Sequence, residues 1–391
     1  MIKLGLLCDY PINNELIKLG IKSNVWHPGS QPVINLIEGL SFDNDIVINI
    51  ITTTKIINKS IFININDNIK LHILPIPNIS GMITAFIPRI IIINKYINNL
   101  NLDIVHGQGT EGEYSLAAIT SKYPNIITVH GILREVKKYY KIPLWNPGKL
   151  GVYLEYITLK YAKNINSISK YAENIIKNIS KGKIYNIANP VNDKYFNIEK
   201  DIKNNTILFI GSICKAKGFM DLLKAAEIIE NKKLKYIWKI IGKPIGYKYD
   251  DNIKYYNDFI NNNLKNQKFE FLGWLQIEKI IPHLVSTICV VLPSYCENSP
   301  MVVAETMASS TPIISTNVGG IPELIDNGKS GFVINVGNYE ELANTIIYLN
   351  DNKDIAINIG REARLKAKKY DKILIAHNTM NVYKEILKIN I

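Results

Sequence analysis

The chain is poor in cysteine. Four cysteines stand among 391 residues, at positions 8, 214, 289 and 296, and no two of them form a Cys-x-x-Cys pair. This spacing excludes the common zinc modules and a disulfide framework, and it is typical of free, mostly buried thiols in a reducing compartment. We therefore expect a cytoplasmic location.

Long apolar runs are also lacking. The most apolar stretch, residues 83–97, is interrupted by Pro88, Arg89 and Lys95 and falls short of a membrane-spanning helix. The opening residues MIKLGLLCDYP lack the apolar core of a signal peptide and are typical of a first β-strand. We expect any membrane contact to be peripheral, at the inner face.

Acidic residues are outnumbered by basic ones. The chain has 46 Lys and Arg against 34 Asp and Glu, a net charge of +12, and residues 1–190 hold 20 of the former against 12 of the latter. A basic half suits an anionic membrane or an anionic acceptor; the alternative is a solvated face in a Lys-rich chain. Because no basic run is interleaved with aromatic residues, we expect no nucleic-acid partner.

Apolar runs alternate with helical patterns from end to end. The length of 391 residues suggests about two domains, and continuous apolar strands between helices predict parallel sheets covered on both faces. The polar segment 189–203 interrupts the alternation, which then restarts. We predict two doubly wound α/β units, residues 1–190 and 191–370, and a last helix, residues 371–391, that crosses back to the first unit.

The densest motif is residues 292–332, LPSYCENSPMVVAETMASSTPIISTNVGGIPELIDNGKSGF. We predict that Ser299 caps a helix and that Pro300 is its first residue. The helix start would offer N–H groups, including those of Met301 and Val302, to a diphosphate. Carboxylates at positions 297 and 305 would accept hydrogen bonds from the hydroxyl groups of a sugar and a ribose.

This motif resembles the donor-binding region of family-four glycosyltransferases, through Glu297-x7-Glu305 and the flanking PS, AE, VGG, PE and GF residues. The resemblance implies the GT-B fold, with two Rossmann-like domains facing a cleft, and transfer with retention of configuration. It also implies a UDP- or GDP-linked sugar donor bound mainly by residues 191–370. Glu297 would face the donor sugar and Glu305 the ribose. A glycan or lipid-linked glycan of the cell envelope would be the acceptor, bound mainly by residues 1–190.

A second stretch, FIGSICKAKGFMDLLKAA at residues 209–226, resembles the family's Gly-Arg…Lys-Gly loop that holds the diphosphate. Lys217 matches the family's Lys. Ser212 stands where the family has Arg, and Lys215 is our candidate for the second charge. Lys is a point charge and lacks the bidentate fork of Arg.

Three further positions come from the first half. In ITVHG, His130 ends a strand, and the resemblance places it near the donor sugar and the acceptor. His106 ends the neighbouring strand; for both histidines the alternative is a structural hydrogen bond. Gly29, in the long loop 9–31, is our candidate for a backbone contact with the diphosphate, and we expect this loop to help bind the acceptor.

A metal is not expected. Residues 43–45 form an Asp-Asn-Asp triplet, which holds a metal in another glycosyltransferase fold. Here it precedes an early strand, away from the other motifs, and we interpret it as a turn capped by its own side chains. We expect no cofactor besides the donor substrate.

Three alternatives to an active transferase stay open. One is another enzyme on the same fold, such as a phosphorylase or an epimerase. The second is a two-lobed sugar-binding protein without catalysis. The third is a degenerate transferase that acts as a scaffold, which the Ser212 replacement motivates. Transfer or hydrolysis of nucleotide sugars would separate them.

Overall fold

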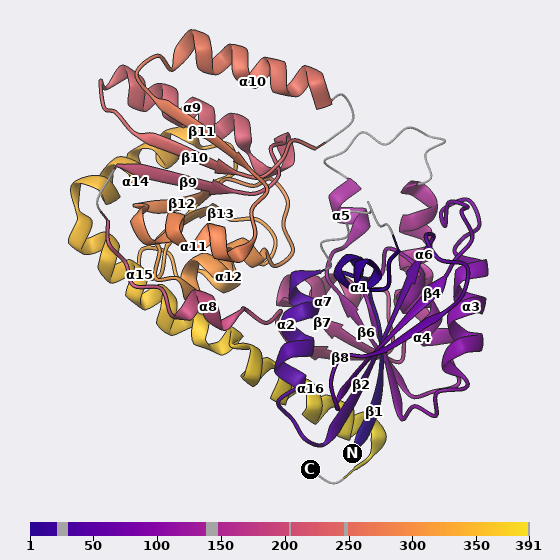
Figure 1. Cartoon of the computed structure of the whole chain (residues 1–391). Helices are drawn as coiled ribbons and strands as arrows, with labels where there is room; N and C mark the ends of the chain where they lie inside the picture. The colour runs from indigo at the N-terminus through magenta and orange to yellow at the C-terminus, as the bar shows by residue number, and fades with distance from the viewer. Residues whose placement is uncertain (22–29, 138–147, 203–204, 246–248, 390–391) are drawn as a thin grey trace. The chain divides into compact units, whose positions relative to one another are not determined.

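A computed structural model describes residues 1–21, 30–137, 148–202, 205–245 and 249–389. The chain forms two compact units (Figure 1). Unit 1 comprises residues 1–190 together with 372–391, and unit 2 comprises residues 191–371. The boundary at Pro190 and Val191 falls inside the polar segment 189–203. No helix among the described residues is long and apolar enough to cross a membrane.

Unit 1 is built on a sheet with the strand order β3-β4-β2-β1-β5-β6-β7-β8, counted over the described residues. Its interior strands are almost wholly buried, and Ile, Leu and Val make up most of β1 and the first part of β2. The strands are β1 (Ile2–Leu7), β2 (Ile46–Thr54), β3 (Ile61–Asn64), β4 (Ile69–Pro75), β5 (Ile104–Gln108), β6 (Asn125–Val129), β7 (Asn164–Ser167) and β8 (Lys183–Asn186).

The unit 1 sheet is parallel, as predicted, except at one edge. β3 pairs with β4 in the antiparallel sense. A short turn joins the two strands, in which Asn66 Oδ1 accepts the N–H groups of Asn68 and Ile69 at 3.0 and 2.8 Å. A parallel pair would need a long crossover, whereas this link is a hairpin.

Helices cover both faces of the unit 1 sheet. α2 and α16 pack side by side on one face, and α3 and α4 pack on the other (Figure 1). The helices are α1 (Asn13–Lys18), α2 (Gln31–Leu40), α3 (Ile87–Ile97), α4 (Glu113–Thr120), α5 (Leu133–Lys137), α6 (Gly148–Tyr161), α7 (Lys170–Ile176) and α16 (Lys372–Leu387). The predicted loop 9–31 therefore contains a helix, α1, which Leu16 anchors by complete burial.

Unit 2 has a wholly parallel sheet over its described residues, in the order β11-β10-β9-β12-β13-β14. The strands are β9 (Thr206–Ile210), β10 (Ile237–Ile241), β11 (Lys268–Gly273), β12 (Cys289–Leu292), β13 (Ile313–Thr316) and β14 (Phe332–Ile334). The helices are α8 (Asp193–Phe196), α9 (Phe219–Asn231), α10 (Tyr249–Asn263), α11 (Ile277–Ser286), α12 (Met301–Ala308), α13 (Ile321–Leu324), α14 (Tyr339–Asp351) and α15 (Lys353–Ala367), with short 3₁₀ turns at Lys215–Lys217 (η1) and Lys368–Tyr370.

Candidate active site

The loop from β9 to α9 lies against the carboxyl end of β12. Gly218 starts α9 with φ of +69°, and a Cβ there would lie 1.8 Å from the carbonyl oxygen of Pro293. Only glycine permits both the left-handed backbone and this approach. The loops are also hydrogen-bonded, since the N–H of Tyr295 donates to the carbonyl of Ala216 at 2.8 Å. The contact brings Lys217 to the end of β12.

Lys217 and Glu297 form an ion pair. Lys217 Nζ lies 2.6 Å from Glu297 Oε1, and the hydroxyl of Ser294 donates to the same oxygen at 2.8 Å. The Glu297 side chain is 8% exposed and that of Lys217 is 30% exposed, so the lysine forms the open side of the pair. The two sequence motifs of unit 2 therefore meet at one place.

A third loop, which follows β13, packs against the backbone of Glu297. Gly319, after β13, has φ of +55°, and a Cβ there would lie 1.7 Å from the carbonyl oxygen of Glu297. The N–H of Gly320 donates to the carbonyl of Asn298 at 2.8 Å. Gly319 of the VGG sequence is thus needed for close packing of backbone against backbone.

The predicted cap of α12 is wrong by one residue. Pro300 is the N-cap, with φ of −69° and ψ of 122°, and the helix begins at Met301; Ser299 precedes it without capping it. Proline fixes only φ, and the extended ψ here delays the helix by one residue. Met301 and Val302 then provide the first helical N–H groups, which have no acceptor within a helix.

Glu305 lies on α12 beside Tyr195 of α8. The phenol of Tyr195 hydrogen-bonds to the carboxyl group, and Tyr195 itself is buried. Burial raises the pKa of Glu305 to about 7, and the Tyr195 hydrogen bond opposes that rise. The sequence alone did not indicate Tyr195, which lies in the polar segment 189–203, because no spacing connects that segment to the Glu-x7-Glu pair.

The remaining predicted positions are less well placed. Lys215 is exposed, and its charge acts on Asp221 of α9. Gly29 lies outside the described residues. The Asp43–Asp45 triplet forms a local turn, in which Asp43 Oδ1 accepts the N–H of Asp45 at 2.8 Å.

In unit 1, His130 belongs to a buried chain of hydrogen bonds. Its Nε2 lies 2.8 Å from Gln108 Oε1, and Gln108 Nε2 lies 3.2 Å from His106 Nε2. His106 Nδ1 lies 2.7 Å from the hydroxyl of Tyr383 on α16. If the amide of Gln108 donates to His106, then His130 carries a proton on Nε2 and His106 carries one on Nδ1.

Both imidazoles are neutral at physiological pH. Burial lowers the pKa of His106 to about 3 and that of His130 to about 4. A hydrogen bond that His130 donates to the side chain of Asn189 partly offsets this lowering of the His130 pKa. His106 therefore makes structural hydrogen bonds, which was the alternative interpretation. Gln108 bridges it to His130 by one hydrogen bond to each imidazole.

A pocket of about 380 Å³ lies at the carboxyl ends of β1, β2, β4 and β5, and we call it the unit 1 pocket. Its volume is within the range of small-molecule sites, roughly 300–1,000 Å³. Its lining combines charged, hydroxyl and apolar groups: Asp9, Thr53, Thr54, Lys55, Ile56, Ile76, Phe86, Arg89, Gln108, Glu111, Gly112, Glu113 and Tyr114.

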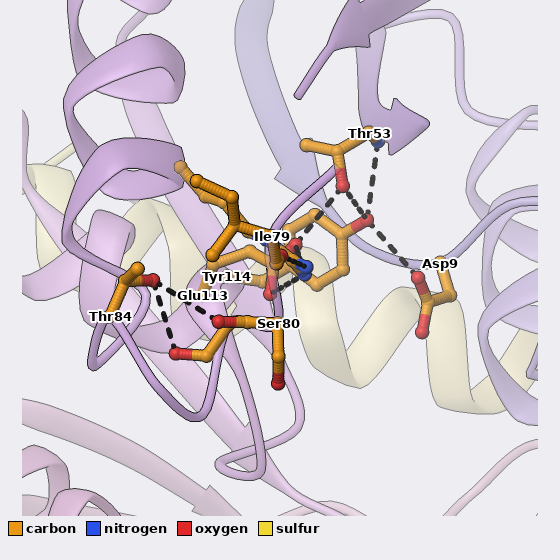
Figure 2. Close-up of polar contacts among 9 residues, drawn as sticks. Asp9, Thr53, Ile79, Ser80, Thr84, Glu113 and Tyr114 are labelled. Atoms are coloured by element: carbon orange, nitrogen blue, oxygen red, sulfur yellow. Dashed lines mark hydrogen bonds and ion pairs between the residues drawn. The ribbon is translucent and has the colours of Figure 1, made fainter. Parts of the chain in front are cut away.

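The polar groups of this pocket are fixed in place (Figure 2). Arg89 Nη1 lies 3.1 Å from Glu113 Oε1, and both side chains are largely buried. Thr53 donates to the same Glu113 oxygen at 3.1 Å, and Tyr114 donates to Asp9 at 3.1 Å. No sequence motif contains this cluster, because Asp9, Thr53 and Arg89 lie far apart in sequence from one another and from Glu113 and Tyr114.

The pocket is more acidic than the unit around it. Three carboxylates line it, from Asp9, Glu111 and Glu113, against the two cations Lys55 and Arg89. Carboxylates accept hydrogen bonds from hydroxyl groups and repel anions. The expectation of an anionic acceptor therefore does not suit this pocket, which fits a neutral, hydroxyl-rich group.

A family model described as glycosyl transferases group 1 matches residues 191–372, which are unit 2 and the first residue of α16. Through this unit, the chain resembles the group 1 glycosyltransferases. An uncharacterized glycosyltransferase of Methanocaldococcus jannaschii is 28% identical over 316 residues, covering 81% of this chain and 83% of the relative. A capsular polysaccharide biosynthesis glycosyltransferase of Staphylococcus aureus is 24% identical and covers 70% and 73%.

Solved structures show the same fold over the whole chain. Sucrose-phosphate synthase from Thermosynechococcus elongatus superposes with a TM-score of 0.80 at 17% identity, covering 100% of both chains. HepE from Anabaena, in complex with UDP-glucose, superposes with a TM-score of 0.72 at 14% identity, covering 98% of this chain and 100% of HepE. The predicted GT-B fold is confirmed.

Proposed function

We propose that this chain is a group 1 glycosyltransferase, which transfers a sugar from a UDP- or GDP-linked donor to a hydroxyl group of a cell-envelope glycan or lipid-linked glycan, with retention and without a metal. The observation that carries the proposal is the convergence of three loops of unit 2 on the Lys217–Glu297 pair. The UDP-glucose complex of HepE and the capsule relative support the donor and acceptor classes.

Different residues of unit 2 bind different parts of the donor. Glu305 accepts hydrogen bonds from the ribose hydroxyls, while Lys217 and the first N–H groups of α12 neutralise the charge of the diphosphate. Glu297 orients the hydroxyls of the sugar. The acceptor oxygen replaces the diphosphate at the anomeric carbon and passes its proton to the departing diphosphate, while Lys217 stabilises the charge that collects on this leaving group.

The Lys217–Glu297 pair explains how the ligand-free site keeps its shape. Glu297 is nearly buried, so without the donor its charge needs the lysine and the Ser294 hydroxyl. An incoming diphosphate competes for Lys217, and the sugar hydroxyls then hydrogen-bond to the oxygen that Lys217 leaves. Binding thus exchanges one set of polar partners for another.

The acceptor side of the proposal is in unit 1. The unit 1 pocket accepts a hydroxyl-rich group, and His130, held neutral, is able to hydrogen-bond to the sugar or the acceptor. The unit carries 23 Lys and Arg against 13 Asp and Glu, or +10 of the net charge of +12. This excess of positive charge supports peripheral binding of the protein to an anionic membrane.

The first experiment is thermal unfolding of the wild type and Glu305→Ala with a panel of nucleoside diphosphates and nucleotide sugars. Ligand binding raises the melting temperature according to its concentration over its Kd. A rise with one nucleotide that is lost in the variant identifies the base. The absence of any rise at millimolar ligand rejects the donor site. A rise without transfer or hydrolysis identifies the degenerate scaffold.

A further inference from the structure

Four isoleucines at intervals of four residues stand exposed beside the unit 1 pocket. Ile79, Ile83, Ile87 and Ile91 are 51%, 75%, 57% and 60% exposed, and we call them the isoleucine face. Single exposed apolar side chains are ordinary on a protein surface, but a run of large ones marks an interaction site.

The backbone holds these side chains outward. Before α3, Ala85 and Phe86 adopt left-handed conformations, with φ of 50° and 60°, which are costly for residues with a Cβ. The turn buries Phe86 at 7% exposure, where it lines the unit 1 pocket, while Ile83 and Ile87 remain outside. Strained backbone is thus used to place one side chain inside and its neighbours outside.

Hydrogen bonds make the isoleucine face a fixed surface. Arg89 Nη2 donates to the carbonyl of Ile79 at 3.1 Å, while its Nη1 is held by Glu113. The hydroxyl of Thr84 donates to the carbonyls of Ser80 and Gly81 at 3.4 and 3.3 Å (Figure 2). The segment is therefore connected on its inner side to the pocket.

A basic group adjoins the face. Lys95, one turn beyond Ile91, is exposed. A lysine beside large apolar side chains is typical of surfaces that lie in the headgroup region of a bilayer.

We propose that the isoleucine face inserts into the headgroup–acyl boundary of an anionic membrane. The net charge of +10 on unit 1 complements such a surface. Because Phe86 and Arg89 of the same segment line the pocket, insertion places the pocket at the bilayer, where it receives the sugar of a lipid-linked acceptor. This inference rests on the proposed function and assigns its acceptor to the lipid-linked class.

The test measures cosedimentation of the full chain with vesicles of phosphatidylcholine alone or mixed with phosphatidylglycerol. We expect binding to the mixed vesicles and a loss of about tenfold or more in affinity for Ile83→Asp/Ile87→Asp, because both apolar burial and electrostatic attraction contribute. Ile83→Trp retains binding. Leu365→Asp in unit 2, where Leu365 is 57% exposed, is the matched control and binds as the wild type does.

Equal vesicle binding by the double Asp variant and the wild type overturns the proposal. A variant that changes the oligomeric state and not vesicle binding also overturns it, because the face would then join copies of the chain. Nucleotide-sugar stabilisation, measured in the same variants without vesicles, reports on the donor site separately. Its failure in the wild type would refute the proposed function whatever the vesicles show.

Discussion

At the scale of single residues, the two lysines of the β9–α9 loop differ in environment. Lys217 is ion-paired to Glu297 in the site, whereas Lys215 is exposed. We expect Lys217→Ala to lower kcat about 100-fold or more, the range found for removing one group that stabilises a transition state. Lys215→Ala should change kcat less than about threefold. Steady-state kinetics decide the matter, and equal losses in both variants would show that Lys215 replaces the missing Arg.

Glu305 gives a pH prediction. Its pKa is raised to about 7, so the folded protein favours the protonated carboxyl, and this group's contribution to stability falls as pH rises from about 4.5 through 7. Ribose hydroxyls need the ionised form, so donor affinity should move in the opposite direction. We expect a Kd about tenfold weaker at pH 6 than at pH 8, because one unit of pH changes the ionised fraction by up to tenfold.

The suitable ligand is a nucleotide sugar, whose esterified phosphates do not titrate near neutral pH. Glu305→Gln should bind more weakly and show a flat profile. Tyr195→Phe removes the hydrogen bond that opposes the rise in pKa, so its profile should move to higher pH. A wild-type profile as flat as that of the Gln variant would refute the ribose assignment.

Residue identity predicted the site only where the residues lie close in sequence. Glu297 and Glu305 are eight positions apart and carry a recognisable context, and Lys217 lies in a second one. Their supporting residues could not be found in this way. Tyr195 reaches Glu305 from another element, and Arg89 reaches Glu113 from another helix. These pairs depend on how elements pack, which a short motif does not describe.

At the scale of elements, Gly218 allows the β9–α9 loop to contact β12. Gly218→Ala adds a methyl group 1.8 Å from a carbonyl oxygen and should separate Lys217 from Glu297. Gly328 has a similar φ of +75° with nothing within 4 Å, so Gly328→Ala has only the backbone cost, about 1 kcal/mol. Thermal unfolding should show a clearly larger loss for Gly218→Ala.

Nucleotide-sugar affinity completes this comparison. We expect Gly218→Ala to weaken binding and Gly328→Ala to leave it unchanged, since only the first displaces the ion pair. Similar losses of stability and affinity in the two variants would mean that the loop contact is not needed for the donor.

Elements were predicted well where apolar periodicity is strong. The strands 206–210 and 237–241, TILFI and IWKII, belong to the apolar runs that predicted a parallel sheet, and each run ends at a glycine. Short elements were missed. β3 and α1 bury few side chains. The formation of β3 depends on its pairing with β4, and that of α1 depends on the burial of Leu16. Neither interaction gives a clear pattern in the local sequence.

At the scale of the whole molecule, the end of the chain completes the core of unit 1. Tyr383 on α16 is fully buried and reaches His106 across 277 positions of sequence. Tyr383→Phe leaves His106 Nδ1 without its partner, at a cost of about 1–3 kcal/mol for a buried polar group. The disturbance should pass through Gln108 to His130. We expect a lower kcat with an unchanged Kd for the nucleotide sugar, because the donor residues belong to unit 2.

Tyr348→Phe is the control, since Tyr348 is exposed on α14 of unit 2. Hydrogen exchange separates the two ways in which Tyr383→Phe could lower kcat. Faster exchange confined to β5 and the end of β6 indicates a loosened hydrogen-bond chain, whereas faster exchange throughout α2 and α16 indicates a general loss of packing. Only the first supports a positioning role, and a kcat equal to that of the wild type would assign Tyr383 and His106 to stability alone. A residue in the last helix would then affect the reaction only through the fraction of folded protein.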